Sequence, residues 1–211
     1  MTGRQKVALA PGNTTPDYLE LSLGKFLDRV ASGGPAPGGG SVAAVAVALA
    51  AALSGMSARL SADQLADAPE LADRADVSRR RVAPLARADA ESYGRVLDAY
   101  HLPREPDPET RTTRIRDALS GAADVPLAIA EVGNEVAVIA ARLVEEGNPN
   151  LEGDAMTAVL LAEVGVRAAA ALAEINLSSA NVEDERLGRA NRLVDMTAAT
   201  VRRAIQGGGR G

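Results

Sequence analysis

The chain has 211 residues, of which 46% are hydrophobic and only 2% aromatic, and its formal net charge is −5. The absence of cysteine excludes disulfides, thiolate nucleophiles and cysteine metal sites, and the single histidine, His101, excludes a multi-histidine metal centre. The acidic balance disfavours a nucleic-acid partner. No signal peptide or bilayer-spanning run is evident, so we expect a cytoplasmic protein without a membrane partner.

Helical periodicity predicts an all-α fold. We expect residues 1–16 to form a flexible arm, residues 17–206 one helical domain and residues 207–211 a flexible tail. The domain is predicted to contain helices over about 17–31, 41–61, 69–100, 108–146, 154–177 and 183–206. No segment shows sustained period-2 alternation, so no strand is predicted. The expected architecture is a bundle of long, partly kinked helices without a sheet.

Particular residues shape these expected helices. In the first helix, Leu23, Phe26, Leu27 and Val30 recur at helical spacing and predict one apolar face. The second helix is apolar nearly all round and is expected to be central and buried. Proline lacks a backbone N–H, so Pro84 is expected to kink the third helix, and a second break is expected near Pro126 in the fourth.

A glycine-rich segment precedes the second helix and is the most informative stretch of the chain. It contains Pro37, Gly38, Gly39, Gly40 and Ser41. We predict that Ser41 caps the helix and that the glycines leave a positively polarised helix start open to a ligand. The spacing is near that of a phosphate-binding loop, but the lysine is missing. A plain helix connection, in which glycine only relieves crowding, stays open as the alternative.

A second polar turn separates the fourth and fifth expected helices. Asn148 and Asn150 are suited to presenting amide groups to a heterocyclic ligand, and Asp154 is predicted to cap the fifth helix. The alternative is a purely structural turn, in which one helix ends and the next begins.

Asp89 is an unusual residue for the interior of a helix, because its short carboxylate competes for backbone amides. A mid-helix aspartate is commonly just solvated. Ser92 and Tyr93 lie about one turn further on, near the same helix face, so the three side chains are also suited to lining a ligand pocket. His101 stands at the expected end of this helix, where a capping or surface role competes with a catalytic one.

Together these segments give the chain a family resemblance. It resembles the cyclodeaminase/cyclohydrolase family of folate enzymes over about residues 21–206. The resemblance rests on segments in the family's order: Phe26-Leu27, Pro37-Gly38-Gly39-Gly40-Ser41, Asp89-Ala90-Glu91-Ser92-Tyr93, Leu102-Pro103, Pro126-Leu127, Gly147-Asn148, Asp154 and Ile175-Asn176-Leu177. Two positions depart from the pattern: Gly153 stands where the family often has serine, and Leu172 where it often has asparagine.

The resemblance implies an all-α homodimer that acts on a tetrahydrofolate one-carbon substrate, and it matches Asp89 to the family's proposed catalytic aspartate. Lacking cysteine and having one histidine, the chain has carboxylates as its best acid–base groups. We therefore predict Asp89 as the catalytic group and Asp154 as a second, orienting carboxylate, without a metal or a permanently bound cofactor. The predicted substrate-binding residues are Pro37, Gly38, Gly39, Gly40, Ser41, Tyr93, Asn148 and Asn176.

Three functions are compatible with this resemblance and these residues. The first is hydrolysis of 5,10-methenyltetrahydrofolate to 10-formyltetrahydrofolate. The second is formiminotetrahydrofolate cyclodeamination, which releases ammonia. The third is a non-catalytic helical dimer that binds a folate or a partner. The absence of an attached formiminotransferase domain from the sequence favours the first.

Overall fold

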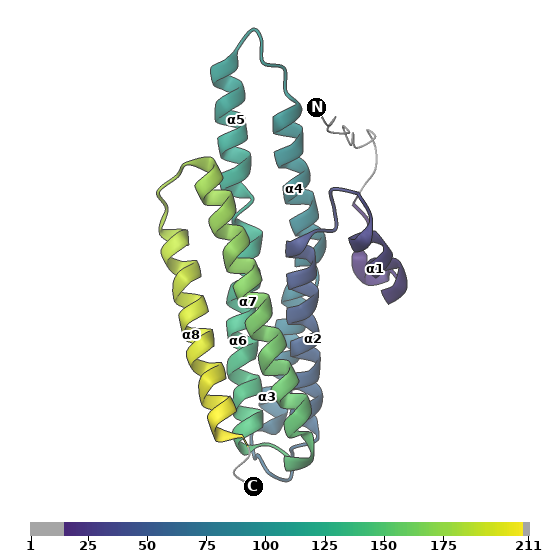
Figure 1. Ribbon diagram of the computed structural model, residues 1–211. Helices are drawn as coiled ribbons and strands as arrows, with labels where there is room; N and C mark the ends of the chain where they lie inside the picture. The colour runs from purple at the N-terminus through teal and green to yellow at the C-terminus, as the bar shows by residue number, and fades with distance from the viewer. Residues whose placement is uncertain (1–14, 209–211) are drawn as a thin grey trace.

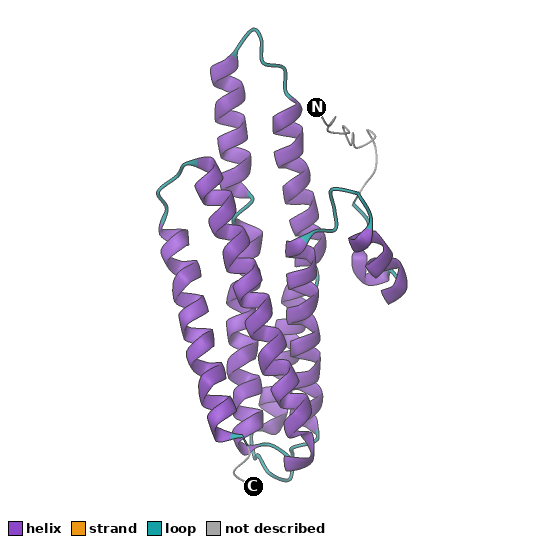
Figure 2. Ribbon diagram, viewed as in Figure 1, coloured by secondary structure: helices purple, strands orange, loops and turns teal. Residues whose placement is uncertain are grey.

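The computed structural model describes residues 15–208 and shows, within that range, an elongated bundle of helices without strands (Figures 1 and 2). The all-α prediction is therefore confirmed for the part of the chain described. Residues 1–14 and 209–211 lie outside this range, so the extents of the arm and the tail remain predictions. The elements are η1 (Tyr18–Glu20), α1 (Leu23–Ala31), α2 (Gly39–Arg59), α3 (Ala68–Val82), α4 (Leu85–His101), α5 (Pro108–Gly121), α6 (Asp124–Glu146), η2 (Pro149–Leu151), α7 (Glu152–Ala180) and α8 (Glu185–Gly207).

Three long helices, α2, α6 and α7, form the centre of the bundle. Small residues let them approach closely, and two glycines show how closely. An ideal Cβ on Gly165 of α7 would lie 2.4 Å from a methyl carbon of Val47, and one on Gly133 of α6 would lie 2.6 Å from a methyl carbon of Val166. α3 packs on α2, and α8 packs on α6 and α7. The hairpin of α4 and α5 extends beyond the end of α8 (Figure 1).

The helix breaks only partly follow the predicted kinks. The segment predicted as one helix over 69–100 is two helices, α3 and α4, separated at Ala83 and Pro84. Pro84 has no N–H to continue the ladder, and its ring crowds the carbonyl four residues earlier. The fourth predicted segment does break near Pro126, as expected, but the chain turns at Ala122 and Ala123 rather than at the proline itself. Pro126 then lies in the first turn of α6, where a helix requires no donor.

The first predicted helix is also shorter than expected. η1 takes its N-terminal part, and α1 begins after Ser22, whose side chain accepts a hydrogen bond from the amide of Lys25. Only Phe26 of the predicted apolar face is buried, whereas Leu23 is 68% and Leu27 56% exposed. The apolar face of α1 is therefore largely exposed to solvent within one chain.

Two stretches of the described chain are long and apolar enough to cross a membrane, by length and composition alone. They are Gly39–Arg59 and Pro149–Ala180, and about half of each apolar window is buried inside the bundle. The helices at the centre of a packed bundle show the same properties, so this finding is weak evidence for a membrane span.

Candidate functional site

The carboxylate of Asp89 on α4 packs directly against the start of α2. An ideal Cβ on Gly40 would lie 2.0 Å from Oδ1 of Asp89 and 2.3 Å from its Cγ. No side chain fits in that space, so glycine at this position is a requirement of the contact. The glycine segment and the mid-helix aspartate, 49 positions apart in the sequence, are thus neighbours in the fold.

The start of α2 is bare, as the glycines indicated, but Ser41 does not cap it. The N-cap residue is Gly38, which has no side chain to accept a hydrogen bond from the first turn. Ser41 is already inside the helix, and its hydroxyl donates to the carbonyl of Ala86 on α4 at 2.7 Å. The prediction failed because α2 begins two residues earlier than expected. The Ser41 hydroxyl instead ties α2 to α4 one turn before Asp89.

The environment of Asp89 alters its acidity. Burial raises the pKa of the Asp89 carboxyl above its usual range, while the backbone N–H and the hydroxyl of Ser41 act in the opposite direction. The hydroxyl proton is committed to Ala86, so the first-turn amide is the donor that favours the carboxylate. A carboxyl with a raised pKa holds and releases protons closer to neutral pH than a solvated one, as a general acid–base group requires.

A cavity of about 340 Å³ opens in front of this carboxylate. Six predicted site residues line it: Gly38, Gly39, Gly40, Asp89, Tyr93 and Asn176. The other lining residues are Pro35, Ala36, Ala90, Ser92, Ala122, Leu172 and Ile175. Elements α2, α4 and α7 therefore meet at one pocket, together with the turn between α5 and α6.

Two predicted site residues, Asp154 and Asn148, lie at the end of the bundle opposite to the Asp89 pocket. Asp154 is in the first turn of α7 and Asn176 near its other end, so about 33 Å of helix separates them. Asp154 is also not the N-cap, since α7 begins at Glu152 after Leu151. One chain therefore does not bring Asp154 to the pocket as a second carboxylate.

Asn148 is a structural residue of the same distant turn. Its Oδ1 accepts from the amide of Asn150 at 3.0 Å, and its Nδ2 donates to the carbonyl of Leu60 at 2.9 Å. Its own backbone amide donates to Oγ of Ser61 at 2.9 Å. These bonds connect the α6–α7 turn to the end of α2, which is the structural alternative left open above.

The remaining predicted residues lie beside the pocket or away from it. Pro37 is buried next to the lining residues without lining the cavity itself. His101 is exposed at the end of α4 and does not contribute to the pocket wall. Of the two departures from the family pattern, Leu172 contacts the Gly39 position, at 3.6 Å from an ideal Cβ, whereas Gly153 lies near Asp154 at the far end.

Sequence reasoning missed part of the apolar wall. Ala122 was not singled out, Ile175 was noted only as part of a family segment, and Leu172 only as a departure from the family pattern. Leu172, Ile175 and Asn176 follow the i, i+3, i+4 spacing of one helix face, which is the signal that would have found them once Asn176 was chosen.

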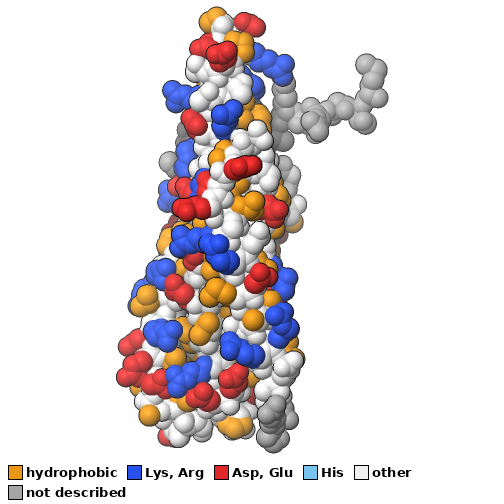
Figure 3. Space-filling model, turned by 90° about the vertical axis from the view of Figure 1, so that its left-hand side faces the viewer, with side chains coloured by type: hydrophobic (Ala, Val, Ile, Leu, Met, Phe, Trp, Pro, Cys, Tyr) orange, Lys and Arg blue, Asp and Glu red, His pale blue; other side chains and the backbone are white. Residues whose placement is uncertain are grey.

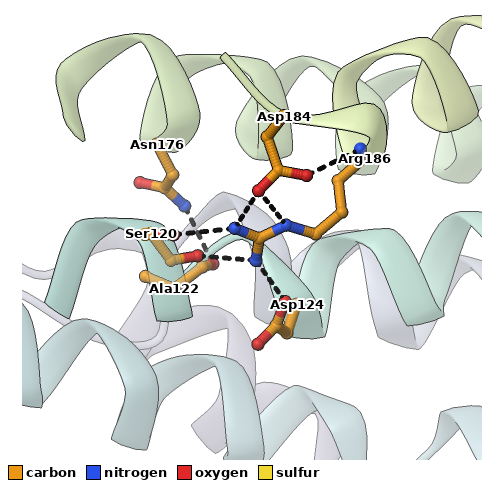
Figure 4. Close-up of polar contacts among 6 residues, drawn as sticks. All are labelled: Ser120, Ala122, Asp124, Asn176, Asp184 and Arg186. Carbon is orange, nitrogen blue, oxygen red and sulfur yellow. Dashed lines mark hydrogen bonds and ion pairs between the residues drawn. The ribbon is translucent and has the colours of Figure 1, made fainter. Parts of the chain in front are cut away.

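Asn176 is held in one orientation by the turn between α5 and α6 (Figure 4). Its Nδ2 donates to the carbonyl of Ala122 at 2.9 Å. A carbonyl only accepts, so the bond fixes which end of the amide is the nitrogen, and Oδ1 and the second amide hydrogen are left for other partners.

The same turn is anchored by Arg186, at the start of α8. The guanidinium donates to the carbonyl of Ser120 at 2.9 Å, to its hydroxyl at 2.7 Å, and to the carboxylates of Asp184 and Asp124 (Figure 4). These bonds hold the turn that contains Ala122 against the α7–α8 connection. Arg186 thereby stabilises the pocket wall without lining the pocket.

The fold and the pocket define a class of site: a helical bundle that holds one half-buried carboxylate at a bare helix start, inside a cavity with an apolar wall. Across residues 15–208, no group of three or more histidine, cysteine, aspartate or glutamate side chains is placed to hold a metal ion. The polar groups at this pocket are the Asp89 carboxylate, the backbone amides at the start of α2 and the side-chain amide of Asn176.

Comparisons with known proteins identify the family. The formiminotransferase-cyclodeaminase family model matches residues 22–192. The chain is 38% identical over 159 residues to a methenyltetrahydrofolate cyclohydrolase of Methylorubrum extorquens, an alignment that covers 72% of this chain and 76% of that protein. It is 33% identical over 161 residues to the formimidoyltransferase-cyclodeaminase of Rattus norvegicus, covering 70% of this chain but only 29% of that longer protein.

A solved structure agrees with the sequence comparisons. The crystal structure of formiminotetrahydrofolate cyclodeaminase from Thermotoga maritima superposes with a TM-score of 0.78 at 26% identity, covering 89% of this chain and 96% of that one. The chain belongs to the formiminotransferase-cyclodeaminase family, as the resemblance of its motifs predicted.

Proposed function

We propose that this protein hydrolyses 5,10-methenyltetrahydrofolate to 10-formyltetrahydrofolate, with Asp89 as the general acid–base group. The observation that carries the proposal is the position of the Asp89 carboxylate, which lines the pocket against Gly40 and is half-buried there. This burial raises the pKa of the carboxyl. The relative with the cyclohydrolase name shares 38% identity over most of both chains, which supports hydrolysis as the main reaction.

The hydrolysis requires a group that takes a proton from water and gives a proton to N5. The methenyl carbon is bonded to N5 and N10 and carries a positive charge, which the Asp89 carboxylate stabilises. A water molecule adds to that carbon as Asp89 accepts one of its protons. The bond from the carbon to N5 then breaks, N5 receives the proton from Asp89, and the second water proton leaves as the formyl C=O forms on N10.

The glycines and the helix start supply binding. Gly38, Gly39 and Gly40 present backbone without side chains to the cavity, so a flat ring or a carboxylate tail is able to approach closely. The first turn of α2 has no side chain at its N-cap, and its free backbone amides favour negative charge. The apolar side chains of Leu172 and Ile175 form the opposing wall, where they are suited to covering one face of a pteridine ring.

Formiminotetrahydrofolate cyclodeamination is the second candidate, and the Thermotoga maritima structure favours it. In that reaction N10 attacks the formimino carbon, and a carboxyl group in the position of Asp89 protonates the departing nitrogen, which leaves as ammonia. The same pocket serves both reactions, because each passes through a tetrahedral carbon between N5 and N10.

We also propose that two copies of the chain associate through the α2–α7 side. Exposed apolar residues lie on both of these neighbouring helices: Val42, Leu49 and Met56 on α2, and Leu160, Val164 and Ile175 on α7. The α2 residues repeat every seven positions, as they do along a helix that packs on another helix. By contrast, the face seen in Figure 3 carries interspersed basic and acidic side chains. A second copy is the occupant that an apolar face of this kind fits.

An absorbance assay tests the reaction. The purified protein should speed the loss of the methenyltetrahydrofolate chromophore over the rate in buffer. A gain of that chromophore from formiminotetrahydrofolate, with release of ammonia, would instead assign the cyclodeaminase. Folate binding without either change would favour the non-catalytic dimer. The cytoplasmic location stays a prediction.

A further inference from the structure

Ser92 is a buried hydroxyl without a partner at the edge of the pocket. The residue is only 2% exposed, and among the residues that the structure describes no group lies within hydrogen-bond distance of its Oγ. Buried hydroxyls are nearly always paired, because an unpaired one has lost its water without gaining a replacement. An unpaired group in a ligand pocket therefore points to a bond that forms with the ligand.

The position of Ser92 supports this interpretation. It lies three residues after Asp89 on α4, on the same helix face, and it borders the same cavity. Its Oγ is shielded in the free protein, so it reaches a ligand by rotating about χ1 to another staggered position. That rotation breaks no hydrogen bond, because the hydroxyl has none to lose.

Among the described residues that line the pocket, Ser92 carries the one fully buried side-chain donor. The ionised Asp89 carboxylate only accepts, and Asn176, which is only partly buried, uses one of its two amide hydrogens on the carbonyl of Ala122. Tyr93 carries a hydroxyl but is 44% exposed at the rim. Within the lining that the structure describes, Ser92 is the buried side chain able to donate to an oxygen of the ligand.

We propose that Ser92 is a binding and specificity-determining residue, whose hydroxyl turns into the pocket and donates a hydrogen bond to an oxygen atom of the bound folate. This inference rests on the proposed function, since it assumes a folate ligand in the Asp89 pocket. A ligand that lacks the oxygen acceptor leaves the hydroxyl buried and unpaired, and is therefore bound more weakly.

The chain offers a matched control. Ser57 on α2 is 1% exposed, and its Oγ is likewise unpartnered among the described residues. It lies about 24 Å along α2 from Ser41 and does not line the Asp89 pocket. Ser57→Ala and Ser92→Ala thus remove the same chemical group from a similar environment, and only one of them removes it from the pocket.

The test measures two properties of the unchanged protein and of the two variants. Thermal melts without ligand report stability, and calorimetric titration with 5-formyltetrahydrofolate reports affinity. We expect both variants to melt at or above the temperature of the unchanged protein, because each loses an unpaired buried hydroxyl. We expect Ser92→Ala to bind the probe about tenfold more weakly and Ser57→Ala to bind it as the unchanged protein does.

Two results would overturn the inference. Equal affinity of Ser92→Ala and the unchanged protein would remove the hydroxyl from binding while the proposed function stands. A lower melting temperature of Ser92→Ala alone, without ligand, would show that the hydroxyl has a structural partner. Failure of the unchanged protein itself to bind the probe and to turn over either folate is a distinct pattern: it refutes the proposed function, and the role of Ser92 with it.

Discussion

Gly40→Ala is the substitution that the structure predicts most sharply. The added Cβ would stand 2.0 Å from Oδ1 of Asp89, where ordinary contact begins at about 3.4 Å. The carboxylate must therefore move by about 1.4 Å or turn away from the start of α2. A displacement of about 1 Å in a catalytic group is enough to lower turnover about 100-fold. Gly40 lies in the first turn of α2, and alanine is the better helix former, so the bundle itself is expected to survive.

The assay compares steady-state loss of methenyltetrahydrofolate absorbance with the melting temperature. Gly94→Ala is the matched control, because Gly94 is inside α4 and an added Cβ there meets nothing within 4 Å. We expect Gly94→Ala to keep full activity and Gly40→Ala to lose about 100-fold in kcat while remaining folded. Full activity of a folded Gly40→Ala variant would refute the argument that the contact with Asp89 positions the carboxylate.

Three further predictions concern stability, the pocket wall and association. Burial raises the pKa of the Asp89 carboxyl in the folded protein, so ionisation of this carboxyl lowers the stability of the fold. The contribution of Asp89 to stability is therefore fully present below about pH 3.8 and is lost as pH rises through its pKa in the folded protein. Urea titrations should show the Asp89→Asn variant gaining stability over the unchanged protein toward neutral pH. Arg186→Gln removes the hydrogen bonds to Ser120, so the turn beside Asn176 should loosen. We expect the melting temperature to fall by about 5 °C and KM to rise by a larger factor than kcat falls. An unchanged KM would contradict the role of Arg186 in stabilising the pocket wall. Light scattering should show that Leu49→Asp weakens association of the 21.6 kDa chain into a dimer on the order of 100-fold. Ile205→Asp, at an equally exposed position on α8, should leave the dimer unchanged. A Leu49→Asp variant that stays dimeric would exclude the α2–α7 side as the dimer interface.

Features that depend on the local spacing of residues could be predicted from the sequence. Apolar periodicity and the absence of strand alternation correctly predicted an all-helical bundle, and the glycine segment correctly indicated a bare helix start. Exact helix limits depend on which donors and acceptors are satisfied. Pro84 ends a helix because it sits where a donor is needed, and Pro126 does not because it lies in a first turn.

The composition of the pocket could not be predicted from the sequence, because it depends on how the helices pack together. Asn148 and Asp154 have the same residue types whether a polar turn binds a ligand or only joins two helices, and only the length of α7 shows that they lie far from Asp89. Leu172 and Ile175 resemble core residues in sequence, so nothing local marks them as a pocket wall. The unpaired state of Ser92 is likewise invisible without the surrounding helices.

The central claim is that the Asp89 carboxylate moves the proton in a folate reaction at the start of α2. The most direct measurement is the turnover of methenyltetrahydrofolate by Asp89→Asn beside Asp98→Asn, an equivalent change at an exposed position of the same helix. The account predicts a loss of about 100-fold or more for the first variant and an unchanged rate for the second. A folded Asp89→Asn protein that turns over at the rate of Asp98→Asn would contradict it.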